Sequence, residues 1–361
     1  MIQTPTDEIR FERRGRLGVV TLDRPHALNA LSRPMVQRLS RQLAAWKDDP
    51  EVAAVLVKAV PGRAFCAGGD IRVVSDLLRT EGVDAATPFF RDEYRMNWRV
   101  HTFPKPYVAL LDGITMGGGV GISVHGGFRV VTENTLFAMP ETGIGFFPDV
   151  GATWFLPRCP GRIGPWLGLT GARLDGPDCL LAGVGTHPVP AAALPALEQR
   201  LVDAVLGDGD AHGIVAGCLE EAAGPIGTPS LPNLRVRIDH CFGGAGVGEI
   251  VERLESEPTG FGAEQLQALA AKSPLSVRVT FEQLRRGSDL DIEGCLALEY
   301  RMLHRVLAAG DFAEGVRALL IDKDKRPRWR YPTLAEVPDA EVEAAMAPLP
   351  GGDLGFDWQD T

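Results

Sequence analysis

The sequence lacks the local patterns that mark several common cofactor and metal sites. No GxGxxG follows the first predicted strand and no GxxxxGK[ST] occurs, so neither a dinucleotide-binding fold nor a P-loop is supported. None of the six cysteines forms a CxxC pair, and the seven histidines show no HExxH or other paired ligand spacing. We therefore expect neither a metal site nor a disulfide framework, and we interpret the cysteines as free thiols.

Positive charge and long apolar runs are also scarce. The chain carries 37 Lys and Arg against 47 Asp and Glu, a formal net charge of −10, which argues against nucleic acid as a partner. No apolar run is long enough to span a membrane, so we expect no membrane partner. The first residues lack a signal-peptide apolar segment, and the acidic pair at residues 7–8 fits a mitochondrial transit peptide poorly. The expected location is the cytoplasm, with a mature matrix protein as the alternative.

Strand and helix patterns alternate over the first part of the chain. Residues 8–13 and 17–22 alternate as a hairpin, residues 52–60 and 106–113 are buried-strand patterns, and a helix is expected after the N-cap Ser32. Such units predict an α/β fold. Beyond about residue 160 the pattern is mainly helical, and the Gly-, Pro- and Ala-rich residues 208–232 are interpreted as a linker or surface segment. The predicted division is residues 1–205, with the active site, and a mainly helical region over 206–361.

Three segments carry the chemistry: AFCAGGD (64–70), TMGGGVG (115–121) and MPETGIGFFPDVG (139–151). The first two place glycines just before helix-like stretches, where backbone N–H groups can be aimed at one point. Two N–H groups from separate turns can form an oxyanion hole. The third segment adds two carboxyls, Glu141 and Asp149, among apolar neighbours.

Each signal taken alone also has an ordinary structural explanation. The glycine turns are explained equally well as tight turns, and single polar residues as caps, solvated carboxyls or packed side chains. The residues with such an explanation are Cys66, Asp70, Glu93, His125, Glu141 and Asp149. The combination is therefore far more specific than any of its members.

In this order and spacing the segments resemble the crotonase (enoyl-CoA hydratase/isomerase) superfamily. VTLDRPHALNALS (20–32) resembles the loop that lies along CoA in that superfamily, and the likeness runs from about residue 8 to about residue 325. RDEYRMNW (91–98) and EGVRALLIDKD (314–324) point to its 3-hydroxyisobutyryl-CoA hydrolase branch. The resemblance implies a ββα spiral core with a mainly helical C-terminal region. It also implies an acyl-CoA substrate and no cofactor, because CoA is part of the substrate.

The resemblance also assigns roles to individual residues. Gly69 and Gly118 would supply the oxyanion N–H groups, Glu141 the main catalytic carboxyl and Asp149 the second one. Glu93 would contact the acyl group. The residues expected to contact CoA are His26, Ala27, Leu28, Ala30, Ala64, Cys66, Ala67 and Lys323.

The position of the second acid favours thioester hydrolysis over hydration. In the hydratase branch a glutamate ends the second glycine motif as GGGxE, whereas here that position is Gly121. Asp149 instead adds a carboxyl eight residues after Glu141, where hydratases commonly have glycine. We expect hydrolysis of a short-chain 3-hydroxyacyl-CoA, foremost 3-hydroxyisobutyryl-CoA in valine catabolism.

Several alternatives stay open at this point. An enoyl-CoA hydratase or isomerase on the same fold is one, and a non-catalytic acyl-CoA-binding protein is another. The sequence does not decide which acyl group is preferred, or whether Glu141 attacks the thioester or activates a water. It also leaves open whether the chain forms a homo-oligomer and what residues 326–361 do.

Overall fold

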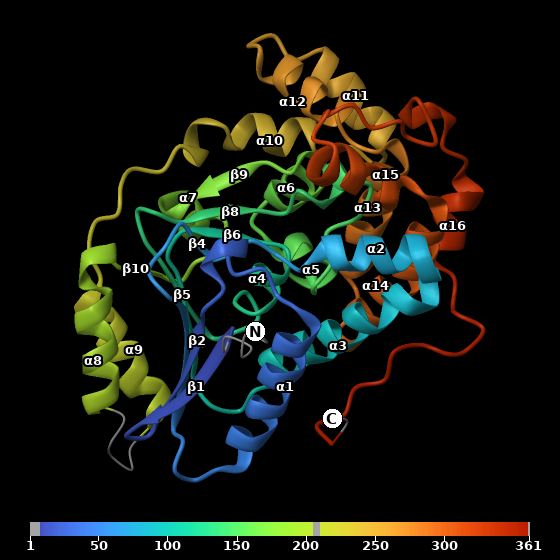
Figure 1. Ribbon diagram of the computed structural model, residues 1–361. Coiled ribbons are helices and arrows are strands. Elements are labelled where there is room, and N and C mark those ends of the chain that lie inside the picture. Colours follow the sequence, from blue (N-terminus) through green and yellow to red (C-terminus); the bar gives the residue numbers. More distant parts are fainter. Residues whose placement is uncertain (1–7, 205–209, 360–361) are drawn as a thin grey trace.

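Two β-sheets form the N-terminal part of the protein, and several successive strands alternate between them (Figure 1). A computed structural model describes residues 8–204 and 210–359. The larger sheet has the order β1-β2-β3-β5-β7-β10 and the smaller one β4-β6-β8-β9. The larger sheet consists of β1 (Ile9–Arg14), β2 (Leu17–Leu22), β3 (Ala54–Ala59), β5 (Tyr107–Leu111), β7 (Phe128–Val131) and β10 (His187–Pro188). The smaller sheet consists of β4 (Ala64–Cys66), β6 (Ile114–Met116), β8 (Leu136–Ala138) and β9 (Arg173–Asp175).

The chain passes from the larger sheet to the smaller one three times in the same direction. β3 leads to β4, β5 to β6 and β7 to β8, and the pairs β3–β5, β5–β7, β4–β6 and β6–β8 are all parallel. A helix or helical turn follows each passage: α2 (Ile71–Glu81), α4 (Gly118–Gly121) and the 3-10 turn η2 (Glu141–Ile144). This is the ββα spiral expected from the sequence. It brings the ends of β4, β6 and β8 to one edge.

Both faces of the larger sheet are covered at its centre, which explains why β2 and β5 are buried along their whole length. Every residue of β2 and β5 is buried. One face packs on α1 (Arg33–Asp48) and α3 (Val83–His101), and the other on α8 (Leu194–Ala204) and α9 (Ala211–Ala222) (Figure 1). The hydroxyl of Ser32 accepts a hydrogen bond from Met35 N–H, so the predicted N-cap is confirmed.

The interpretation of residues 208–232 as a linker or surface segment was wrong in part, because helix α9 occupies Ala211–Ala222. Its Val215 and Leu219 are fully buried against the sheet, so helical spacing of apolar residues outweighs the high glycine and alanine content. The division predicted at residue 205 lies outside the described residues.

The second half of the described chain is mainly helical, as expected. The α-helices between β8 and α8 are α5 (Ala152–Phe155) and α6 (Ile163–Thr170), which precede β9, and α7 (Gly176–Leu181), which follows it. Those after α9 are α10 (Arg235–Cys241), α11 (Val247–Glu255), α12 (Phe261–Ala270), α13 (Pro274–Gly287), α14 (Ile292–Ala309), α15 (Asp311–Val316) and α16 (Asp339–Met346). A π-helix (Arg317–Ile321) continues α15.

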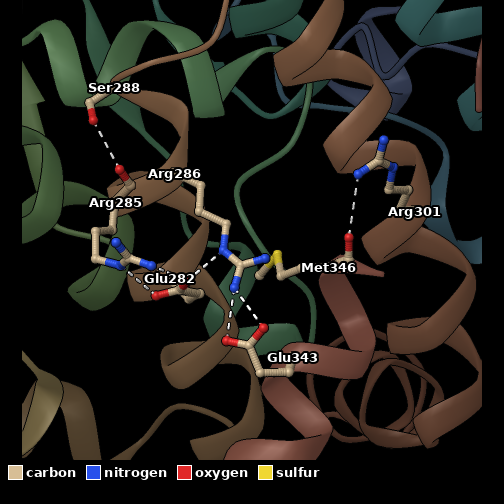
Figure 2. Close-up of polar contacts among 7 residues, drawn as sticks. All are labelled: Glu282, Arg285, Arg286, Ser288, Arg301, Glu343 and Met346. Atoms are coloured by element: carbon tan, nitrogen blue, oxygen red, sulfur yellow. Dashed lines mark hydrogen bonds and ion pairs between the residues drawn. The ribbon is translucent and has the colours of Figure 1, made fainter. Parts of the chain in front are cut away.

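The last helix is fixed to its neighbours by polar contacts as well as by packing. Figure 2 shows Arg286 of α13 bridging Glu282 of its own helix and Glu343 of α16, at 2.8 Å from both Glu343 oxygens. Arg301 of α14 donates to the carbonyl of Met346, which is itself buried. Residues 326–361 therefore include a helix that belongs to the C-terminal core.

A pair of glycine substitutions tests how tightly helix α13 packs against helix α5. A Cβ at Gly287 would lie 2.1 Å from the carbonyl oxygen of Thr153 in α5, whereas one at Gly217 in α9 would meet nothing within 4 Å. Gly287→Ala should lower the free energy of unfolding by about 1–3 kcal/mol through overpacking. Gly217→Ala should raise it by about 0.5–1 kcal/mol, because alanine has the better helix propensity. Urea denaturation measures both, and equal effects would contradict the packing argument.

Candidate active site

The two glycine turns predicted from the sequence meet backbone to backbone. They follow the neighbouring parallel strands β4 and β6, whose carboxyl ends lie at the same edge. A Cβ at Gly119 would lie 2.2 Å from the carbonyl oxygen of Cys66, and one at Gly68 would lie 3.9 Å from Gly118 N. Gly68 has φ +120 and Gly117 has φ +48. Glycine is required here because a side chain would separate the turns.

The two predicted oxyanion donors lie on either side of this contact. Gly69 and Gly118 both line a cavity of about 320 Å³. Gly118 is the first residue of α4, so helical hydrogen bonding leaves its N–H without a partner. Within residues 8–204 and 210–359, neither N–H donates to a protein acceptor. Two such donors at one cavity wall suit an oxygen that gains negative charge.

The loop over residues 23–32 is attached to the first glycine turn. Asn29, at φ +56, donates to the carbonyl of Ala64 at 2.9 Å and accepts from Arg24 N–H at 2.8 Å. Leu31 N–H donates to the carbonyl of Gly68 at 2.8 Å. Asp70 stands at the N-cap position of α2 but makes no capping bond; its carboxylate accepts from Arg24 at 2.7 Å instead. The sequence-based interpretation of Asp70 as a cap was therefore wrong, because the ion pair with Arg24 takes its carboxylate.

Three buried carboxyls from three different elements line the same cavity. Glu93 of α3, Glu141 of η2 and Asp149 are 2%, 7% and 5% exposed. The Glu141 Oε1 atom lies 3.3 Å from the place of a Cβ on Gly117, so this carboxyl faces the second turn. Asp149 accepts a hydrogen bond from the hydroxyl of Tyr94 at 3.0 Å. The sequence-predicted acids and N–H donors are thus brought together in one site.

Burial changes the proton affinity of these acids. Loss of hydration raises the pKa of Asp149 to about 7, although the Tyr94 hydroxyl bond opposes the rise. Burial raises the pKa of Glu141 well above its usual value, and the charge of Asp149 adds to it while Lys272 opposes it. The pKa of Glu93 is raised in the same way, first by burial and then by Asp149 and Glu141. Acids of this kind exchange protons near neutral pH.

The predicted residues differ in how close they lie to the cavity. Ala67, Gly69, Glu93, Gly118, Glu141 and Asp149 line it, whereas the other predicted substrate contacts do not. His26 and Lys323 are exposed. Burial raises the pKa of the Cys66 thiol to about 12, and its sulfur bonds the carbonyl of Gly68, so Cys66 has no features of a nucleophile. Contacts of Ala27, Leu28, Ala30 and Ala64 with CoA stay predictions, as do those of His26, Cys66 and Lys323.

Four residues near these acids were not identified from the sequence. Tyr94 and Asn97 lie on α3, Lys272 lies between α12 and α13, and Glu299 lies on α14. Lys272 lines the cavity, and burial lowers the pKa of its amine while the charge of Glu141 opposes that change. Glu299 is fully buried. Tyr94 and Asn97 lie within RDEYRMNW (91–98), but that segment assigned no role to them, and Lys272 and Glu299 have no glycine turn or motif beside them.

The place of the missing hydratase glutamate is filled by other side chains. A Cβ at Gly121 would lie 2.5 Å from Asn97 Nδ2 and 2.8 Å from Val150 Cβ. A glutamate could not be placed there without moving both residues. The loss of an acid at position 121 is therefore built into the packing around it.

The comparisons with known proteins agree with this geometry. A family model described as enoyl-CoA hydratase/isomerase matches residues 17–346. The chain belongs to that family. The predicted crotonase-like α/β fold is confirmed by solved structures of the same fold, described next.

Members of the family similar to this chain carry different descriptions. The 3-hydroxyisobutyryl-CoA hydrolase, mitochondrial, of Xenopus tropicalis is 44% identical and covers 96% of this chain and 90% of its own length. That of Homo sapiens is 43% identical and covers 97% and 91%. A structure described as an enoyl-CoA hydratase from Rhodobacter sphaeroides 2.4.1 has TM-score 0.88 and 43% identity over 97% of this chain and 100% of its own. One described as a carnitinyl-CoA dehydratase from Mycobacterium thermoresistibile has TM-score 0.90 and 37% identity over 99% and 100%.

Two further properties of the described residues bear on location and metals. No helix among them is long and apolar enough to cross a membrane. No three His, Cys, Asp or Glu side chains in the described ranges come together so that they could hold a metal ion.

The raised pKa of Asp149 makes stability depend on pH. The folded state holds this proton up to about pH 7, whereas an unfolded aspartate loses it near 3.8. The contribution is therefore full below about pH 4 and is lost as the pH rises through 7. Between these two pH values, the proton on Asp149 lowers the free energy of unfolding by about 1.4 kcal/mol for each unit of rising pH. Asp149→Asn should lose less stability than the wild type between pH 5 and 8.

Urea denaturation at several pH values measures this difference, with Asp76→Asn as the control because the Asp76 side chain is 64% exposed. A variant whose pH slope equals that of the wild type would show that Asp149 is ionised in the folded protein at pH 5.

Proposed function

We propose that the protein hydrolyses the CoA thioester of a short-chain 3-hydroxy acid, foremost 3-hydroxyisobutyryl-CoA. The observation that carries the proposal is one cavity that is lined both by Gly69 and Gly118, whose N–H groups have no acceptor in the described residues, and by a buried pair of acids, Glu141 and Asp149. The proteins named 3-hydroxyisobutyryl-CoA hydrolase, whose matches cover 96% and 97% of this chain, support the same reaction and a role in valine degradation. Proteins of this family act on CoA esters, so CoA belongs to the substrate.

The acyl end of the cavity is small and aromatic. Phe90 stacks on Phe146 with ring centroids 5.3 Å apart, and the ring of Phe312 is tilted against Phe146 at the same centroid distance of 5.3 Å. All three rings line the cavity together with Glu93. A short branched acyl group fits such walls, and Glu93 offers a hydrogen-bonding partner for a hydroxyl.

In this site the thioester carbonyl oxygen takes the place between the two N–H groups. Attack on the carbonyl carbon turns that oxygen into an oxyanion, and one such donor contributes roughly 3–4 kcal/mol to lowering the barrier. The attacking oxygen belongs either to a water that Glu141 deprotonates or to Glu141 itself, through a mixed anhydride that water then cleaves. Asp149, with its pKa raised to about 7 by burial, gives a proton to the leaving thiolate. Overall, thioester and water become acid and thiol.

Hydration is the second candidate, because the solved relatives are described as a hydratase and a dehydratase. Hydration across Cα–Cβ needs one acid to position water and another to move a proton at Cα. Asn97 and Val150 fill the space beside Gly121 where the first of these acids would stand. Hydrolysis needs no acid there, so the packing favours it.

The surroundings of the enzyme in the cell are also part of the proposal. We retain the cytoplasm as its location, although the vertebrate relatives are named mitochondrial proteins. No bound cofactor enters the mechanism. Homo-oligomer formation stays an open prediction that sedimentation velocity measures directly.

Substitution of Glu141 tests the reaction itself. The wild type should release free CoA thiol from 3-hydroxyisobutyryl-CoA, followed with a thiol reagent. Glu141→Gln should abolish the release while binding of the ester persists, because the amide neither attacks nor accepts the proton. Glu255→Gln, at an exposed position in α11, is the control.

Two results would contradict the proposal. Near-normal turnover by Glu141→Gln would end the role of Glu141. No release by the wild type from this ester or from 3-hydroxypropionyl-CoA would end the hydrolase assignment, and assays with crotonyl-CoA and a 3-enoyl-CoA would follow.

Substitution of Glu93 tests acyl selection. Glu93→Ala should reduce the preference, in kcat/KM, for 3-hydroxyisobutyryl-CoA over isobutyryl-CoA by about tenfold or more, because a buried hydrogen bond to the hydroxyl is lost. Asp92→Ala is the matched control, since Asp92 pairs with Arg33 outside the cavity at 2.7 Å. An unchanged preference in Glu93→Ala would refute the role.

A further inference from the structure

A fully buried carboxyl from the C-terminal helices lies directly behind the active-site acids. Glu299 of α14 is 0% exposed, and its two oxygens accept from Gly151 N–H at 2.8 Å and Thr153 N–H at 3.0 Å. No Lys or Arg of the described chain forms an ion pair with it. Burying an acid without a cation is costly, so these two hydrogen bonds are what hold it in place.

The turn that receives these bonds carries Asp149 and has a strained backbone. Val150 has φ +54, which is unfavourable for a β-branched residue, and Gly151 has φ +85. A backbone of this kind persists only when its surroundings fix it, at a cost on the order of 1–3 kcal/mol per residue. Ala152 N–H closes the turn on the carbonyl of Asp149 at 2.9 Å.

Two other side chains hold the same turn from different sides. The His125 ring nitrogen Nε2 lies 2.7 Å from the carbonyl of Val150, and since a carbonyl only accepts, Nε2 carries the proton. Gln283 of α13 donates to the carbonyl of Pro148 at 2.6 Å and to the Thr153 hydroxyl at 2.7 Å. Glu299 is the one of the three that is negatively charged when ionised, and it accepts from the N–H groups of Gly151 and Thr153, two and four residues after Asp149.

We propose that Glu299 is a positioning residue for the hydrolysis proposed above. It fixes the backbone turn that directs Asp149 into the cavity, and its negative charge favours the protonated form of Asp149. The inference rests on the proposed function for its effect on turnover. It places part of the active-site geometry under the control of helix α14, far along the chain from the glycine motifs.

The two acids influence each other electrostatically as well as through the turn. Burial raises the pKa of Glu299 to about 8, the charge of Asp149 adds to it, and the bonds from Gly151 and Thr153 oppose it. Two buried like charges repel, so the pair resists carrying both charges at neutral pH. The titratable groups that interact electrostatically with this pair are Glu93 and Tyr94 of α3, Glu141 of η2 and Cys295 of α14. His125 bonds the same turn at Val150, and Lys272 lines the cavity beside Glu141.

The first arm of the test measures turnover. Glu299→Gln has one acceptor oxygen instead of two, so one of the two N–H groups loses its partner and Asp149 is displaced. The expected result is a fall in kcat of about 100-fold with little change in KM, as for a small misplacement of a reacting group. Glu299→Asp keeps the charge but is one methylene too short to reach both groups, so it should also lower kcat. Glu264→Gln, exposed on α12, is the control.

The second arm does not depend on turnover. Asp149→Asn and Glu299→Gln are combined in a double-mutant cycle, and the free energy of unfolding is measured in urea at pH 5 and pH 9. The expected coupling is larger at pH 9, where both acids are ionised and repel, than at pH 5, where both are protonated and only the turn connects them. A residue that only fills space would give the same coupling at both pH values.

The outcomes separate the two proposals. Absence of thiol release by the wild type, with pH-dependent coupling, would refute the hydrolase proposal and keep Glu299 as the partner of Asp149. Wild-type kcat in both Glu299 variants, or a coupling that does not change with pH, would overturn the inference. If Glu299→Gln does not fold, Glu299→Asp alone decides, with loss of kcat expected and full kcat overturning it.

Discussion

The contact between two glycine turns is the constraint on which the rest of the site depends. β4 and β6 are neighbours in a parallel sheet, and each ends in a turn whose backbone touches the other at Gly68, Gly117 and Gly119. At Gly119 the contact leaves no room for a Cβ, which would lie 2.2 Å from the carbonyl oxygen of Cys66, so the turns that carry Gly69 and Gly118 stay in contact. The loop over residues 23–32 and helix α3 pack onto this pair, so the cavity walls take their places from it.

The acids around this contact are held in a state that an exposed acid would not adopt. Glu93, Glu141, Asp149 and Glu299 are all buried, and the amine of Lys272 lines the cavity beside the first three. Burial raises the pKa of each, and repulsion from neighbouring carboxylates adds to the rise for Glu93, Glu141 and Glu299. The arrangement reduces stability at neutral and higher pH, yet it provides protons at the pH where a thiolate must be protonated. Stability and chemistry thus oppose each other in the same four side chains.

The parts of the structure that the sequence predicted are those in which local pattern and function coincide. A short stretch of sequence was enough to predict each of these features: the hairpin, the helix after Ser32, the glycine turns and the acids at 141 and 149. Glu299 and Tyr94 lie beside Asp149 only because helices from distant parts of the chain pack there. Helix α9 was mistaken for a linker because glycine and alanine content concealed its buried apolar face. Asp70 was mistaken for a cap because its partner, Arg24, lies in another segment.

The distinction between hydrolysis and hydration comes from packing beyond the reacting groups. Both reactions use the same oxyanion donors, so the fold and the glycine motifs do not separate them. Asn97 and Val150 close the space beside Gly121, and Val150 belongs to the strained turn that presents Asp149. The conformation that brings Asp149 into the cavity therefore also places a side chain where a hydratase acid would stand. The turn that Glu299 and His125 hold thus places an acid at position 149, and through Val150 it leaves no space for an acid at position 121.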